Sequence, residues 1–285
     1  MCKPSLTFCR RSKQCWRIGI ALLFVVLASS SHAADRASVE DVTFTANCDN
    51  STQKYLLVYP AKFKNDELHH VLILLHGHGS DRRQITDDTV NEFRAGRDAA
   101  AVRKMLVVSP DYRARTSWMG PKAEADLLQI LGALKSRFRI GKVIVSGASM
   151  GGSSALTFAA MHPELVDGVV SMNGTANHIE YESFQDAIKK SFGGAKADIP
   201  LEYKNRSAEY WPERFTMPIG ITASGQDKTV PAASVLRLAD AIKKLQPNNA
   251  LLIYRESAGH NTSYEDSKAA FEFVLGKAIQ ASAAP

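Results

Sequence analysis

The sequence predicts an α/β fold in which a mostly parallel sheet is covered by helices on both faces. Short apolar runs of strand length recur along the chain, and segments with helical periodicity separate most of them. Continuous apolar strands are typical of a parallel sheet that is buried on both faces. The alternation of strand and helix supplies the crossovers that parallel strands need.

Seven segments are predicted to be strands because each is a short run rich in apolar residues, many of them β-branched. They are residues 55–59, 71–75, 105–109, 142–146, 166–171, 218–223 and 251–254. Five segments have the apolar spacing of amphipathic helices, namely residues 90–102, 122–138, 149–162, 232–245 and 264–279. Residues 173–215 interrupt this alternation and are rich in aromatic side chains, so we expect a small cap insertion within a single domain.

The first 33 residues are predicted to be a secretory signal peptide. Basic residues precede an apolar stretch from Ile18 to Ala28, and small residues at Ser31 and Ala33 favour cleavage after Ala33. The stretch is shorter than the roughly 20 residues of a spanning helix, and an uncleaved membrane anchor is the alternative. We therefore expect residues 34–285 to be exported to the periplasm or the extracellular space, with no stable membrane insertion after cleavage.

Removal of this segment changes the charge balance and the cysteine count. The whole chain has 35 basic and 29 acidic residues. Because the segment contains five of the basic residues and none of the acidic ones, 30 basic residues remain against 29 acidic ones. This near-neutral balance gives no argument for a nucleic-acid partner. Cys48 is the only cysteine beyond the segment, so the mature chain has no internal disulfide.

A candidate nucleophile lies in the sequence GASMGG at residues 147–152. Ser149 follows a predicted strand and precedes a predicted helix, and glycines on both sides remove bulk from this corner. The pattern G-x-S-x-G at such a corner is typical of a nucleophile elbow.

A serine hydroxyl needs a neighbouring base and a third group that orients the base. Asp227 and His260 each follow a later predicted strand, and the carboxyl ends of parallel strands meet at one edge of a sheet. No other histidine follows Asp227 in the chain, which makes His260 the only base in this order. Asp111 also follows a strand, but that strand precedes the nucleophile.

With these motifs the chain, from about Tyr55 onward, resembles the α/β-hydrolase superfamily, and within it the prolyl-oligopeptidase-like and polyester-depolymerase-like serine esterases. GASMGG resembles the superfamily's elbow, HGHG its oxyanion loop, GQDKTVP its acid turn and AGH its histidine loop. The resemblance implies that Ser149 attacks an acyl carbonyl, that His260 moves the proton and that Asp227 orients His260. It also implies that the backbone N–H groups of His78 and Met150 hold the oxyanion.

The implied activity is the hydrolysis of carboxylic esters, on small-molecule or polymer-borne substrates, through an acyl-enzyme intermediate without a cofactor or metal. A serine peptidase of the prolyl-oligopeptidase-like type is the enzymatic alternative, because the same triad serves esters and amides. A non-catalytic binding protein on a hydrolase fold is the alternative from another class. The pair His76 and His78 could suggest a metal site, but no further ligand cluster occurs at zinc spacing.

Two further residues are candidates for substrate contact. Arg113 and Trp118 follow a predicted strand end, where an arginine could hold a carboxylate and an indole could stack on a flat group. The alternative is that Trp118 packs this loop onto the following helix and that Arg113 is solvated.

Overall fold

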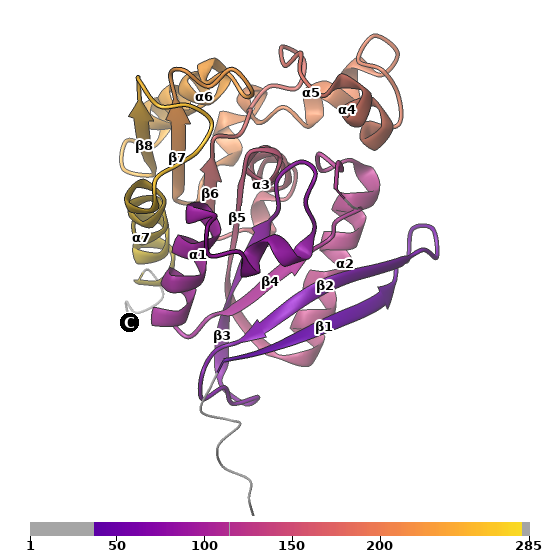
Figure 1. Ribbon diagram of the computed structural model, residues 1–285, viewed down its shortest axis with the longest axis vertical. Helices are drawn as coiled ribbons and strands as arrows, with labels where there is room; N and C mark the ends of the chain where they lie inside the picture. Colours follow the sequence, from indigo (N-terminus) through magenta and orange to yellow (C-terminus); the bar gives the residue numbers. More distant parts are fainter. Residues whose placement is uncertain (1–36, 114, 281–285) are drawn as a thin grey trace, which may run out of the picture.

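A computed structural model describes residues 37–113 and 115–280 of the chain, and these residues form a central eight-stranded sheet (Figure 1). The strands lie in the order β1-β2-β4-β3-β5-β6-β7-β8. The pairs β1/β2 and β2/β4 are antiparallel, whereas every pair from β4/β3 onward is parallel. The predicted fold class is confirmed. The predicted signal peptide and its cleavage site lie outside the described residues.

Seven of the eight strands coincide with predicted segments, with small shifts at their ends. The strands are β1 Ser38–Thr45, β2 Thr52–Tyr59, β3 Leu68–Leu75, β4 Leu106–Pro110, β5 Arg139–Ala148, β6 Gly168–Met172, β7 Ile219–Ser224 and β8 Ala250–Arg255. The sequence pattern missed β1, because this edge strand pairs on one side only and alternates exposed with half-buried positions. An edge strand of this kind lacks the continuous apolar run that identifies the central strands.

Helices cover both faces of the sheet. They are α1 Asn91–Val102, α2 Pro121–Arg137, α3 Met150–Met161, α4 Gln185–Phe192, α5 Pro200–Asn205, α6 Ala233–Leu245 and α7 Tyr264–Gln280. Helices α1 and α7 lie side by side on one face, and α2, α3 and α6 pack on the other (Figure 1). The side chains of β3 alternate between the two cores, since Val71 and Ile73 join one and Leu72 and Leu74 the other. Because both faces of β3 are buried, its sequence is an unbroken apolar run.

The chain between β6 and β7, which contains residues 173–215, lies at the carboxyl end of the parallel strands and carries α4 and α5 (Figure 1). Arg206, which is buried, joins this segment to the body of the domain. Its guanidinium donates to the carbonyl of Met119 and to the carboxylate of Glu124, both at 2.7 Å. Because both acceptors belong to α2 or the loop before it, the segment is fastened to the helix layer beneath it.

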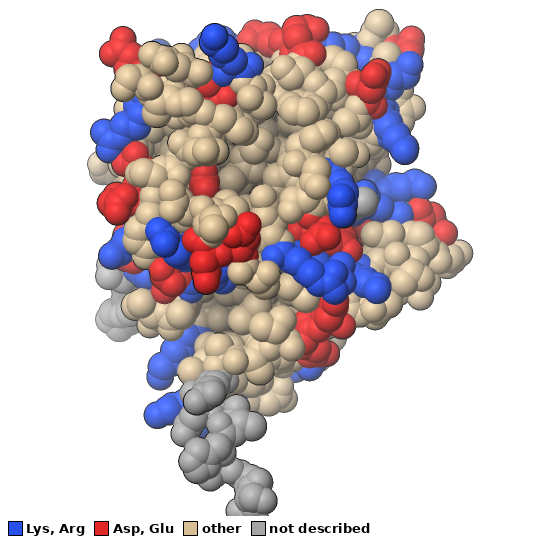
Figure 2. Space-filling model, viewed as in Figure 1, with Lys and Arg blue, Asp and Glu red and all other residues tan. Residues whose placement is uncertain are grey.

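The surface that faces the viewer in Figure 2 has basic and acidic side chains interspersed, without an extended region of one sign. Within residues 37–113 and 115–280, no helix combines the length and apolarity that crossing a membrane requires.

His178 lies in the same segment and is fully buried between aromatic rings. Its ring centroid is 6.1 Å from that of Trp118 and 5.2 Å from that of Phe192. Nε2 lies 3.3 Å from the hydroxyl of Thr157, whereas Nδ1 has no partner among the described residues. Burial, with a smaller contribution from the charge of Arg206, lowers the pKa of His178 from 6.5 to about 3.

We expect this histidine to make unfolding easier in acid. Above pH 6.5 both states hold a neutral imidazole, so His178 has no effect on the pH dependence. Between pH 6.5 and about 3 only the unfolded chain takes up this proton, and the free energy of unfolding falls by up to about 1.4 kcal/mol per pH unit. His178→Phe should flatten the stability curve by this amount between pH 6 and 4 in urea titrations. Parallel curves for the two proteins would contradict the prediction.

Candidate active site

Ser149 occupies the single position between the end of β5 and the start of α3. Its backbone has φ 57° and ψ −121°, a conformation that costs a non-glycine residue about 1–3 kcal/mol. The N–H of Ser149 donates to the carbonyl of Met172 at the end of β6 (2.8 Å), which helps to hold this turn. The serine side chain is therefore carried on a strained corner at the carboxyl edge of the sheet.

The glycines around Ser149 are required by close backbone packing. A Cβ atom on Gly151 would lie 1.9 Å from the carbonyl oxygen of Leu75, and one on Gly147 would lie 2.4 Å from the backbone of Gly151. Both distances are far below any van der Waals contact, so a side chain at either position would displace backbone. The small residues that the elbow pattern contains thus allow β5, α3 and the end of β3 to meet at one point.

Ser149, His260 and Asp227 form one chain of hydrogen bonds. Nδ1 of His260 lies 2.7 Å from a carboxylate oxygen of Asp227, and Nε2 lies 2.9 Å from Oγ of Ser149. An ionised carboxylate only accepts, so Nδ1 carries the proton and Nε2 is left to accept from the serine hydroxyl. The other oxygen of Asp227 accepts from the N–H groups of Thr229 and Val230, at 2.9 and 2.8 Å. Asp227 is buried, and each of its oxygens has a defined partner.

The two predicted oxyanion donors belong to residues near this chain of hydrogen bonds, since Met150 directly follows Ser149 and His78 lines the same cleft. In the loop after β3, the N–H of Gly77 donates to Gln84 (2.8 Å) and that of Gly79 donates to the carbonyl of Arg115 (2.7 Å). Within residues 37–113 and 115–280, no acceptor takes the N–H of His78, between them, or that of Met150, at the start of α3. A Cβ atom on Gly77 would lie 3.9 Å from Cβ of Ser149, so this loop borders the elbow.

A cleft of about 200 Å³ opens at Ser149 and His260. It is lined by Gly77, His78, Gln84, Val90, Glu92, Phe93, Ala148, Ser149, His260 and Asn261. Sequence reasoning missed Gln84 and Glu92, because neither belongs to a motif. The one available signal was that Glu92 is an acidic residue in the first turn of a predicted helix.

The structure does not bring Arg113 to this cleft. Its guanidinium makes two hydrogen bonds to Asp126, at 2.6 and 2.7 Å, and one to Asp49 at 2.7 Å. Burial by itself lowers the pKa of Arg113, but the hydrogen bonds to Asp126 and Asp49 outweigh this effect and hold the pKa above its usual range. The arginine is therefore paired with carboxylates rather than solvated, and it joins the loop after β1 to α2.

Trp118 is 0% exposed, so its indole lies under the site rather than at its surface. Nε1 donates to Nδ1 of His78 (3.2 Å), and the ring packs against Tyr181 and Phe184 at centroid distances of 5.5 and 5.6 Å. Trp118 is therefore a buried packing residue, as the alternative expected, but these aromatic partners lie between β6 and β7 and not on the helix that follows it. Trp118 also supports the side chain of His78, which lines the cleft with Ser149.

His76 is buried against the backbone and an aromatic ring. Its Nε2 lies 3.2 Å from the carbonyl of Asp111, and its ring packs at 4.6 Å on Tyr112. Burial lowers the pKa of His76 below its ordinary value. Among the residues that the structure describes, no group of three or more His, Cys, Asp or Glu could hold a metal ion.

The fold and this arrangement are those of the α/β-hydrolase class of serine hydrolases. The family model of the prolyl oligopeptidase family matches residues 113–276, which is more than half of the chain, and the chain belongs to this family. The match includes Ser149, Asp227 and His260. A comparison with curated proteins finds no match.

Solved structures share the fold at low sequence identity. A putative dipeptidyl aminopeptidase IV from Bacteroides ovatus is 17% identical with a TM-score of 0.68, and the match covers 86% of this chain and 36% of that one. An S-formylglutathione hydrolase from Agrobacterium tumefaciens is 16% identical (TM-score 0.66; 87% and 96% covered). FphF, a fluorophosphonate-binding serine hydrolase of Staphylococcus aureus, is 15% identical (TM-score 0.62; 84% and 99% covered). The chain thus spans about a third of the peptidase it matches.

Proposed function

We propose that this serine hydrolase cleaves carboxylic esters, with Ser149 as nucleophile, His260 as general base and acid, and Asp227 as the group that orients His260. The observation that carries the proposal is the hydrogen-bonded chain from Asp227 through His260 to Ser149, at 2.7 and 2.9 Å. A serine hydroxyl that donates to a neutral imidazole can lose its proton as it attacks a carbonyl.

The reaction has two steps. Ser149 attacks the acyl carbonyl, His260 takes the serine proton and returns it to the leaving alkoxide, and an acyl-enzyme remains. Water then attacks the acyl-enzyme with His260 again as the base, the bond between the acyl carbon and Oγ of Ser149 breaks as His260 returns the proton to Oγ, and the acid product leaves. In both steps the N–H groups of His78 and Met150 would donate to the oxyanion, because they lie beside Ser149 without other acceptors among the described residues.

The size of the cleft supports small acyl groups, and the names of two neighbouring structures support esters as substrates. A volume of about 200 Å³ suits a short acyl chain better than a long one. Two solved structures of this fold bear the names of ester-type hydrolases, namely a ferulic acid esterase and the S-formylglutathione hydrolase. Family membership favours a peptidase as the second candidate, since the family is named for prolyl oligopeptidase. Export after cleavage at Ala33 belongs to the proposal and is supported by the sequence of residues 1–33.

Initial rates on a panel of substrates test this proposal. We expect nitrophenyl acetate to be turned over fastest, kcat/KM to fall at least about 10-fold from acetyl to octanoyl esters, and dipeptide nitroanilides to react at least about 100-fold more slowly. Cleavage of the anilides at rates comparable with the esters would make the protein a peptidase. A folded protein that neither turns over the panel nor reacts with a fluorophosphonate would contradict the enzymatic proposal and favour the alternative of a non-catalytic binding protein.

A further inference from the structure

The loop that carries His260 is held by hydrogen bonds from two other parts of the fold. This loop connects β8 to α7. Asn173, directly after β6, donates from Nδ2 to the carbonyl oxygen of His260. Two residues further on, the N–H of Thr262 donates to Oε1 of Glu92 on α1 (2.8 Å). The backbone of the loop is therefore held by hydrogen bonds at His260 and at Thr262.

Glu92 is a buried carboxylate, 7% exposed, and it takes part in none of the ion pairs among the described residues. Burial of an unpaired charge is costly unless other groups compensate it. Here the compensation comes from the N–H of Thr262 and from the start of α1, where Glu92 is the second residue. The same carboxylate lines the cleft with Ser149 and His260. The hydrogen bond from Thr262 in the histidine loop therefore accounts for the buried position of the Glu92 carboxylate.

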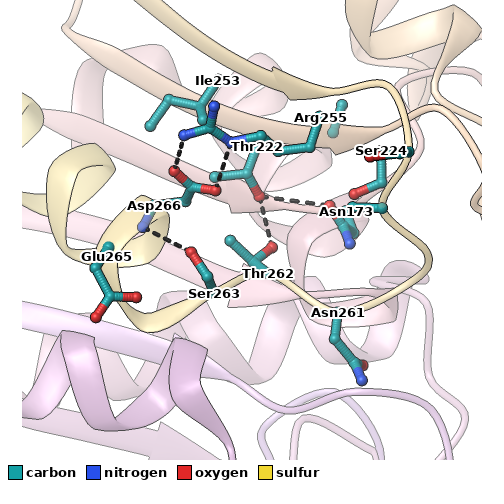
Figure 3. A pocket seen from close by; sticks show the side chains of 13 residues that line it. Asn173, Thr222, Ser224, Ile253, Arg255, Asn261, Thr262, Ser263, Glu265 and Asp266 are labelled. Atoms are coloured by element: carbon teal, nitrogen blue, oxygen red, sulfur yellow. Dashed lines mark hydrogen bonds and ion pairs between the residues drawn. The ribbon is translucent and has the colours of Figure 1, made fainter.

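The side chain of Asn173 is also held against this loop by a hydrogen bond. It is 4% exposed and has φ 47°, a left-handed conformation that asparagine tolerates better than most residues. Its N–H donates to the carbonyl of Thr222 on β7 at 3.0 Å, which leaves the side chain directed at the loop. Figure 3 shows Asn173, Thr222 and Thr262 turned toward one another on the wall of a cavity of about 420 Å³.

The hydroxyls in this group have one consistent order of donation. The hydroxyl of Thr222 lies 3.5 Å from Oδ1 of Asn173 and 2.8 Å from the hydroxyl of Thr262. Each hydroxyl has one proton, so Thr262 donates to Thr222, Thr222 donates to Asn173, and Asn173 donates to the carbonyl of His260. The backbone contact of Thr262 with Glu92 completes a support that links β6, β7, α1 and the histidine loop.

We propose that Glu92 and Asn173 are positioning residues for His260, which hold its imidazole between Asp227 and Ser149. The inference rests on the proposed role of His260 in ester hydrolysis. A displacement of the base by about 1 Å can cost on the order of 100-fold in rate, although substrate binding is unaffected. We therefore expect Glu92→Ala and Asn173→Gly each to lower kcat for nitrophenyl acetate by about 10- to 100-fold, with KM changed less than about 3-fold.

Conservative variants separate positioning from general destabilisation. Glu92→Gln keeps an oxygen that can accept from Thr262, so it should recover most of the loss seen in Glu92→Ala. Asn173→Asp keeps the size of the side chain but has no N–H for the carbonyl of His260, so it should not recover activity. Glycine is used in the deletion at position 173 because it accepts the positive φ without strain.

Matched controls lie at the opposite end of the same strands. Asp167 precedes β6 and accepts from the N–H of Val143 (2.9 Å), and Asn249 precedes β8 and donates to the carbonyl of Thr216 (2.8 Å). Asp167→Ala and Asn249→Gly remove comparable hydrogen bonds far from His260. Their melting temperatures should fall about as far as those of the test variants, whereas kcat should stay near the wild-type value.

The outcomes of this experiment are distinct. Loss of kcat in both test variants, recovery in Glu92→Gln and none in Asn173→Asp support the inference. It is overturned if the test variants lose no more kcat than the controls do, or if Glu92→Gln is as impaired as Glu92→Ala. If the wild-type protein itself neither hydrolyses the ester nor reacts with a fluorophosphonate, the proposed function fails instead.

Discussion

Replacement of Ser149 by alanine is expected to lower kcat for nitrophenyl acetate by about 10⁵- to 10⁶-fold. Loss of the nucleophile removes the acyl-enzyme route, and the remaining donors and binding groups retain only a small part of the acceleration. The hydroxyl of Ser149 donates to His260 at 2.9 Å, and no other serine shares that contact among the described residues. Steady-state rates and fluorophosphonate labelling of the variant measure the effect. Residual turnover above one hundredth of the wild-type rate would assign the nucleophile elsewhere.

The strained backbone of Ser149 also predicts how substitutions at this position change the free energy of unfolding. Because Ser149 has φ 57° and ψ −121°, glycine should fit the corner better than either serine or alanine. Ser149→Gly should therefore be as inactive as Ser149→Ala, with a free energy of unfolding about 1–2 kcal/mol higher than that of the alanine variant. Urea unfolding of the pair checks this difference. Equal stabilities would show that the corner stores no strain.

Asp227→Asn is expected to lower kcat by about 10⁴-fold without unfolding the protein. The N–H groups of Thr229 and Val230 both need an acceptor, so the amide oxygen of the new asparagine must face them. Its NH₂ group then donates toward Nδ1 of His260, which becomes an acceptor and moves the proton to Nε2. In this tautomer the imidazole cannot take the proton of Ser149.

Asp227→Ala provides the comparison. It also removes the acceptor for the two turn N–H groups, so it should lower the melting temperature in addition to the rate, whereas Asp227→Asn should melt near the wild-type value. The kcat of both variants with nitrophenyl acetate, together with their thermal unfolding, distinguishes tautomer control from loss of the turn. A rate within 10-fold of wild type for Asp227→Asn would remove Asp227 from the proposed mechanism.

The order of elements and the composition of the candidate triad could be predicted from local sequence. Apolar runs such as that of β3 reflect burial on both faces, and this requirement acts on each residue of a central strand separately. The elbow glycines also leave a local pattern around Ser149, although only the requirement for Gly147 includes a contact within the elbow, with Gly151, whereas Gly151 is required by the backbone of Leu75 on β3. Ser149, Asp227 and His260 follow from strand ends and chain order, which the sequence contains.

The substrate-contact prediction for Arg113 and Trp118 depended on the direction of side chains, which chain order does not contain. Arg113 turned toward Asp126 and Asp49 because a partly buried guanidinium needs carboxylate partners. Trp118 turned inward because its ring is better packed against Tyr181 and Phe184 than exposed. Each choice was set by residues distant in sequence, which no local pattern of residues 113–118 could identify.

The sequence by itself therefore determined the α/β class, the strand and helix segments of the central sheet, and which three residues are candidates for the nucleophile, base and orienting acid. Only the tertiary structure decided that Glu92 and Asn173 meet the two sides of the histidine loop, 170 residues apart in the case of Glu92 and Thr262. The physical reason is the range of the interactions. Burial and backbone sterics act on neighbouring residues and leave periodic patterns, whereas a single hydrogen bond across the fold leaves none.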